Sequence, residues 1–219
     1  MKRMVMTLCL AAVALAGMAQ SPLSFHAKAG IGTSYLWGKH SNSETRIAYK
    51  MGVGAEYALN RTWVLQSALE FVSIGGKDEL VFGKANMSEL YLQLPVMMAA
   101  RLELGKDYHA SLSAGPYIAC GVGGKTSGTF YRDDDNPNGN RFRLDTFGSM
   151  QHLNMGNKRF DAGIVIGLAF EYHKFRIGAD VQVGLVRINE QINQLMSYTE
   201  TGSYLPKNFA SFFTVGYSF

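Results

Sequence analysis

A histidine and a serine stand two residues apart at His109 and Ser111, in a segment that alternates apolar and polar residues. Residues i and i+2 of a β-strand project to the same face, so these two side chains would lie beside each other. A serine nucleophile requires a neighbouring histidine as base and a third group that orients the histidine. His109 and Ser111 are therefore the candidate pair for hydrolytic chemistry.

A second candidate is the acidic run Asp133–Asp135, which is followed by Asn136, Asn138 and Gly139. This run resembles half of a calcium-binding loop, since calcium requires several oxygen ligands and a sharp glycine turn. The closing glutamate is missing and no flanking helices are indicated, so we expect a solvated loop tip. The remaining histidines are scattered without metal-ligand spacing. The sequence predicts no metal and no cofactor.

The N-terminus has the features of a secretory signal peptide. Lys2 and Arg3 precede the apolar run 4–15, and small residues follow up to Ala19. An apolar run this short, with these flanks, is typical of a cleaved signal rather than of a spanning helix. We therefore predict a signal peptide over residues 1–19 and one mature domain over residues 20–219.

Cleavage would also change the charge and the cysteine content. Loss of Lys2 and Arg3 lowers the formal net charge from +4 to +2, which gives no indication of nucleic-acid binding. Loss of Cys9 leaves Cys120 alone, which excludes an intramolecular disulfide. After residue 19 no run reaches the roughly 18 apolar residues that a spanning helix needs.

The elements that must position these side chains are strands. The clearest period-two alternation runs from Leu90 to Leu104, and the next segment repeats it from Tyr108 to Cys120. Eight such segments are predicted, over residues 25–37, 46–59, 62–75, 88–104, 107–122, 158–173, 174–188 and 208–219.

The connections between these segments differ in length. Tight hairpins are expected at Asn60-Arg61, Gly105-Lys106 and His173-Lys174. The other four connections are longer and cover residues 38–45, 76–87, 123–157 and 189–207. An even number of strands with short turns at one end and long loops at the other is typical of an outer-membrane barrel. This pattern places both termini on the periplasmic side.

Glycines and charges share one face of these strands, and the opposite face is apolar. A lipocalin-like soluble barrel would place the apolar face inside, whereas a membrane barrel places it outside. Repeated glycine suits the crowded lumen of an eight-stranded barrel, so the sequence favours the membrane barrel. The predicted polar lumen, whose charges must pair, comprises Lys28, Lys50, Glu56, Glu70, Glu89, Arg101, Glu103, Asp161, Glu171, Arg176 and Asp180.

The last strand alternates Phe213, Val215, Tyr217 and Phe219 on one face and ends on an aromatic residue. This pattern resembles the signal that the barrel assembly machinery reads. The mature chain also resembles the PorT-like outer-membrane β-barrel domain family through residues 91–95, Gly115-Pro116-Tyr117, residues 160–163 and the closing strand. The resemblance implies an all-β, eight-stranded antiparallel up-and-down transmembrane barrel in the outer membrane, and it brings no catalytic signature.

Three functions follow as hypotheses. The first is a non-enzymatic surface or structural protein embedded in outer-membrane lipid, which contacts extracellular material or protein partners through loop residues Tyr131, Arg132, Arg141, Phe142, Arg143 and Tyr198. The second is an accessory role in a secretion or envelope-assembly complex, by analogy with PorT. The third is a lipid-modifying hydrolase that uses His109 and Ser111. Outer-membrane lipid A deacylases have a similar His-x-Ser pair, but here it would point into the lumen.

Overall fold

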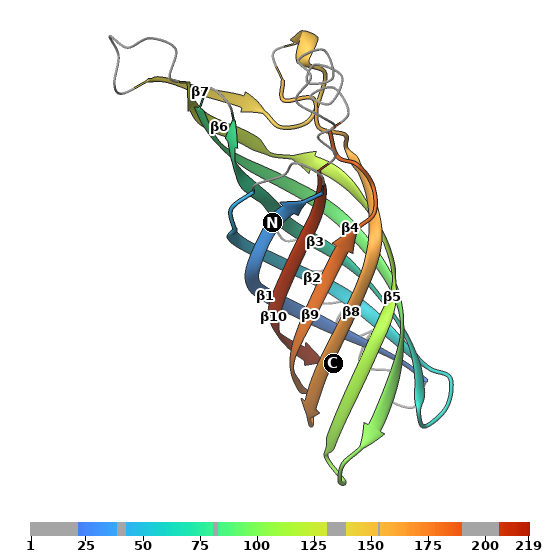
Figure 1. Ribbon diagram of the computed structural model, residues 1–219. Coiled ribbons are helices and arrows are strands. Elements are labelled where there is room, and N and C mark those ends of the chain that lie inside the picture. The colour runs from blue at the N-terminus through green and yellow to red at the C-terminus, as the bar shows by residue number, and fades with distance from the viewer. Residues whose placement is uncertain (1–21, 39–42, 81–82, 131–138, 153, 190–205) are drawn as a thin grey trace, which may run out of the picture.

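Eight long strands form a closed antiparallel barrel in the computed structural model (Figure 1), which describes residues 22–38, 43–80, 83–130, 139–152, 154–189 and 206–219. The barrel strands are β1 (Leu23–Trp37), β2 (Arg46–Ala58), β3 (Trp63–Leu80), β4 (Gly83–Glu103), β5 (Tyr108–Gly123), β8 (Phe160–Tyr172), β9 (Phe175–Gly184) and β10 (Lys207–Ser218). Among the described residues, no helix is long and apolar enough to cross a membrane.

The sheet closes because every barrel strand is paired on both sides. Its order is β3-β2-β1-β10-β9-β8-β5-β4, and the pairing of β3 with β4 completes the ring. At the junction of the chain ends, Val215 of β10 lies opposite Ala29 of β1 and Ile177 of β9. The predicted eight-stranded up-and-down barrel is therefore confirmed. Closure matters because an open strand edge would leave backbone groups unpaired.

The tight turns lie together at one end of the barrel, the lower end in Figure 1, which we call the short-turn end. Residues 59–62, 104–107 and 173–174 connect the strands there. His173 takes a positive φ of 54°, which lets a two-residue turn join β8 to β9. The opposite end, from which the longer connections emerge, is called the long-loop end.

Two predicted loops are strands instead. Residues 76–87 were expected to be a connection, but β3 and β4 continue as a paired hairpin through this region. The charged sequence Lys77-Asp78-Glu79 and the Gly75-Gly76 pair gave a loop signal. Gly75, at φ 137°, introduces an irregularity without ending the strand. Alternation of apolar and polar residues marks a strand only where one face is apolar. Gly75, Gly76 and Lys77 of β3 carry no apolar side chain, so this part of β3 gives no such signal.

The 123–157 connection is also largely structured. It contains strand β6 (Lys125–Phe130), strand β7 (Asn140–Asp145) and a short 3-10 turn, η1 (Met150–His152). β6 pairs with the outer part of β4, and β7 pairs with β6. Together these strands extend the sheet beyond the barrel at the long-loop end, where β6 and β7 stand at the top of Figure 1. We call β6 and β7, with the part of β4 that pairs with β6, the hairpin extension.

The outward face of the barrel is apolar and the inward face is polar. Large exposed hydrophobic side chains recur on β8 at Ile164, Ile166 and Leu168 and on the other barrel strands at alternate positions. The inward face holds glycine where strands approach closely. A Cβ on Gly52 would lie 2.5 Å from the carbonyl oxygen of Leu69, so a larger residue has no room there.

Candidate functional site

Glu56 is the centre of an ion-pair network inside the short-turn half of the barrel. Its carboxylate oxygens lie 2.7 Å from Nη2 of Arg101 and 2.5 Å from Nη1 of Arg176. The amide of Gln66 donates a hydrogen bond to Oε1 of Glu56 at 3.0 Å. Arg176 also lies 2.6 Å from Glu171 through Nη2. The buried charges are thereby compensated by opposite charges and hydrogen bonds.

These partners come from strands that are not neighbours. Glu56 lies on β2, Arg101 on β4 and Arg176 on β9, and no two of these strands pair with each other. Their side chains therefore meet across the lumen. Such contacts tie opposite walls of the barrel together, in addition to the hydrogen bonds of the ladder.

The middle of the lumen holds two further ion pairs. Lys28 lies 2.5 Å from Glu70, and Lys50 lies 2.5 Å from Asp180. The ammonium group of Lys50 also sits 4.7 Å from the centre of the Phe212 ring, a favourable cation–π distance. Gln93 donates to both Glu70 and Gln182, at 3.5 and 3.4 Å. The Lys50–Asp180 and Gln93–Gln182 contacts join strands that are not neighbours, and such contacts fill the interior of a narrow barrel.

The carboxylates nearest the long-loop end are held by neutral donors. Asp161 accepts hydrogen bonds from the hydroxyl of Tyr117 and the amide of Asn208, both at 3.1 Å. Glu89 is fully buried and accepts a hydrogen bond from the amide of Asn157 at 2.5 Å. Tyrosine, asparagine and glutamine give no distinctive sequence signal, so the charge pattern alone did not identify these residues as lumen contacts.

Residues after β7 close the long-loop end of the lumen. The Phe147 ring packs edge-on against Tyr91, with ring centres 5.4 Å apart, and both belong to the main buried cluster. Gly121 makes this possible, because a Cβ there would lie 2.5 Å from the Phe147 ring. Gly121 thereby provides space for an aromatic side chain inside the barrel mouth.

Glu103 differs from the other residues predicted for the polar lumen. It lies at the end of β4 and is exposed at the short-turn end, so it is not part of the buried network. Its ladder partner is His109, whose other partner is Glu171. The register thus places a carboxylate residue on either side of His109, which the spacing along the sequence did not predict.

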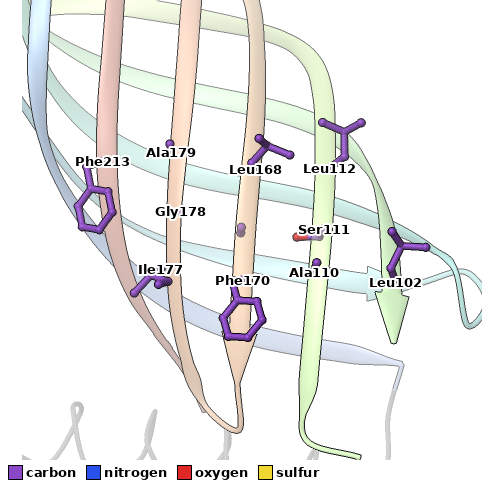
Figure 2. A pocket seen from close by; sticks show the side chains of 11 residues that line it. Leu102, Ala110, Ser111, Leu112, Leu168, Phe170, Ile177, Gly178, Ala179 and Phe213 are labelled. Atoms are coloured by element: carbon purple, nitrogen blue, oxygen red, sulfur yellow. The ribbon is translucent and has the colours of Figure 1, made fainter. Parts of the chain in front are cut away.

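The candidate catalytic pair does not form an assembled site. Ser111 is 6% exposed and lies on the inward face, as expected from the alternation of β5. Within the described residues, no hydrogen bond joins His109 to Ser111. The residues around Ser111 also form an apolar hollow of about 380 Å³ on the outward face, where Figure 2 shows Leu112, Leu168 and Phe170 around smaller side chains.

Replacing Ser111 with alanine is expected to leave the lipid A of the producing cells unchanged, because its buried hydroxyl has no assembled base. Mass spectrometry of extracted lipid A checks this. Ser113→Ala is the matched control, since Ser113 lies two residues further along the same inward face. A change in acylation with Ser111→Ala but not with Ser113→Ala would revive the hydrolase hypothesis.

The hairpin extension has one apolar and one polar face. Phe142 and Leu144 of β7 pack with Met150 against buried Met155. On the opposite face, the ladder places Lys77, Asn86, Ser127 and Arg143 side by side across four strands. Two cavities of about 460 and 440 Å³ lie here and share Ser127 and Arg143.

Of the six loop residues predicted to make contacts, the structure places three. Arg141 and Arg143 are exposed on β7, while Phe142 is half-buried on the other face of the same strand. Tyr131, Arg132 and Tyr198 lie outside the described residues, as does the acidic run from Asp133 to Asp135. Among the described residues, no group of three or more metal-ligating side chains is present.

The closing strand presents its alternating aromatic face outward. Phe213, Val215, Tyr217 and Phe219 are all exposed. Tyr217 packs edge-on against Phe175 and Phe219, at ring-centre distances of 5.4 and 5.6 Å. An aromatic girdle at the end of an apolar outer surface is typical of barrels that span membranes.

A closed barrel with an apolar exterior and a compensated polar interior defines the class of membrane-spanning β-barrel proteins. The chain belongs to the outer membrane protein beta-barrel domain family, whose model matches residues 18–189. It is therefore an outer-membrane β-barrel protein. No curated protein matches the sequence.

Several solved structures are similar in fold. The attachment invasion locus protein Ail of Yersinia pestis is 12% identical, with 90% of this chain and 98% of that chain covered and a TM-score of 0.41. The N-terminal β-barrel domain of Pseudomonas aeruginosa OprF is 14% identical, with 89% and 97% covered and a TM-score of 0.38. Neisserial surface protein A is 9% identical, with 89% and 97% covered and a TM-score of 0.45. The family assignment rests on the family match alone.

Proposed function

We propose that this barrel is a non-enzymatic surface protein that holds the hairpin extension outside the cell. The observation that carries the proposal is the extension itself, a defined sheet whose one face packs against Met150 and Met155 and whose other face is exposed. A rigid barrel with contact residues at one end is a common arrangement for recognition. Arg141 and Arg143, both exposed on β7, are the described residues assigned to contacts with partners.

The lumen supports a structural role rather than transport. Ion pairs cross it from Glu56 to Arg176 and from Lys50 to Asp180. The amide of Gln93 reaches Gln182 across it, and Phe147 packs into its long-loop end. An eight-stranded barrel has an interior that side chains can fill. The network around Glu56 is accordingly assigned to stability.

The proposed orientation places the long-loop end outside and both chain termini in the periplasm. Short turns on the periplasmic side and longer loops on the outer side are the usual arrangement of such barrels. Residues 1–19 would serve as a signal peptide and be removed, leaving residues 20–219 as the mature domain. The aromatic face that ends at Phe219 would be read by the barrel assembly machinery.

Epitope tags inserted at two places test the orientation. A tag between residues 134 and 135, in the segment that joins β6 to β7, is expected to bind antibody on intact cells. A tag between Gly105 and Lys106, in a tight turn at the other end, is expected to bind only after the outer membrane is opened. The reverse labelling pattern would refute the proposed function.

A finer assignment concerns the family within this class. We infer that the chain is a PorT-like member of this class. The inference is based on the strand motifs around Pro95, Pro116 and Asp161 and on the closing strand. That resemblance adds the alternative of an accessory role in a secretion or envelope-assembly complex. Such a role would use the same exposed face of the extension, with a protein partner in place of extracellular material.

A further inference from the structure

The exposed face of the hairpin extension is basic. Together with the adjoining end of β3 it forms what we call the basic face. This face is defined by Lys77 of β3 and by Asn86, Lys125, Ser127, Thr129, Arg141 and Arg143 of the extension, all on one side of the sheet. Two acidic residues lie beside it: Asp145 is 3.1 Å from Lys125, and the exposed Glu44 pairs with Lys77 in an isolated antiparallel bridge. The other described cations of the face thus keep a net positive charge, with hydroxyl and amide groups between them.

A cavity of about 460 Å³ lies within this face, lined by Arg46, Asn86, Ser88, Lys125, Ser127 and Arg143. Arg46 is half-buried, and its Nη1 donates to the carbonyl oxygens of Ile74 and Met87, at 3.1 and 2.7 Å. These bonds fix one guanidinium in place. Fixed guanidinium groups beside hydroxyl donors are well suited to binding the oxygens of a phosphate group.

The position of the face indicates where such phosphates come from. The alternation of β4 is unbroken from Asn86 to Met98, so Asn86 and Ser88 share a face with the apolar residues Leu92, Leu94 and Val96. The outward surface therefore changes from apolar to basic along one strand. In a membrane, that change coincides with the boundary between acyl chains and charged head groups.

We propose that the basic face binds the phosphate groups of a glycolipid in the outer leaflet. This inference rests on the proposed orientation, since the long-loop end must face outward. The apolar strand surface below Ser88 would contact the acyl chains, while Arg46, Arg141 and Arg143 would contact the phosphorylated head group. The hairpin extension would then hold the protein at a fixed depth in the membrane.

Lipid retention by the purified, folded full-length chain in zwitterionic detergent tests the proposal. The probes are a lipid A that carries two phosphates and the same glycolipid without phosphate, with bound lipid measured by native mass spectrometry. The wild type is expected to prefer the phosphorylated lipid. Arg141→Gln/Arg143→Gln is expected to weaken its retention about tenfold, because each cation near an anionic lipid surface contributes to binding.

The matched control is Arg61→Gln/Lys106→Gln, which removes two exposed positive charges at the short-turn end. It should retain phosphorylated lipid like the wild type. Equal loss in both double variants, or equal retention of the two lipids by the wild type, would overturn the proposal. Displacement of the lipid by inorganic pyrophosphate at equal concentration would also overturn it, by assigning the site to soluble phosphates.

The outcomes for orientation and for lipid binding are separable. A surface-exposed tag between residues 134 and 135 without any phosphate preference would overturn the lipid proposal alone. A tag that is inaccessible on intact cells would overturn the proposed orientation, and with it the assignment to the outer leaflet, whatever lipid the purified protein retains.

Discussion

Replacement of Glu56 by alanine is expected to lower the free energy of unfolding by about 3–5 kcal/mol, the usual cost of leaving a buried charge without its partner. Glu56 is 3% exposed and lies within 2.7 Å of both Arg101 and Arg176. Its removal leaves two guanidinium groups facing each other in the lumen. Arg176 keeps Glu171 as a partner, whereas Arg101 retains only the longer 3.6 Å approach to Glu171.

Urea unfolding of the refolded barrel in lipid vesicles measures this effect, with the mobility of the unboiled protein on a gel as the readout of folding. Asp145→Asn is the matched control, because it breaks the exposed pair with Lys125. An exposed pair is worth about 0–1 kcal/mol, so this control should unfold like the wild type. Equal effects of the two substitutions would mean that water solvates the lumen charges as well as it does the surface charges.

Such cross-lumen pairs mark the limit of what the sequence can predict. Alternation along β2 indicated that Lys50 and Glu56 face inward, as the structure places them. The sequence could not pair Lys50 with Asp180, because that contact joins strands 130 residues apart. It depends on the stagger of all the strands between them. Alternation along a strand predicts which face of the sheet a side chain takes. Its contact partner across the lumen depends on the geometry of the closed barrel.

The need for non-local information also explains why strands β6 and β7 were predicted as a loop. Between Lys125 and Asp145 the strands β6 and β7 are short, and β6 carries serine, threonine and glycine on its two faces, a composition typical of a loop. The pairing of β6 with β4 depends on β4 continuing beyond the barrel. Pairing between strands that are distant in the sequence is not visible in the alternation of residues along one strand. The barrel strands were predictable because the apolar exterior repeats the same alternation on each of them.

Substitution of Ile166 by arginine is the most direct test of which face meets lipid. Ile166 lies at the middle of β8, is 53% exposed, and has Ala114 and Val181 as its ladder neighbours. Arginine at the bilayer midplane of a barrel costs about 2–4 kcal/mol. We expect a loss of this size in the free energy of unfolding measured in lipid vesicles.

Tyr172→Arg is the control for Ile166→Arg, because the two positions differ in their place along β8. Tyr172 is also outward-facing and exposed, but it ends β8 at the short-turn end. Arginine near the interface costs only about 0–1 kcal/mol, so Tyr172→Arg should unfold nearly like the wild type. A soluble barrel would show no such gradient, since an exposed arginine costs little anywhere on a wetted surface. Equal, small effects at both positions would therefore contradict the membrane-facing assignment of this surface, whereas a steep gradient would fix the depth of β8 in the bilayer.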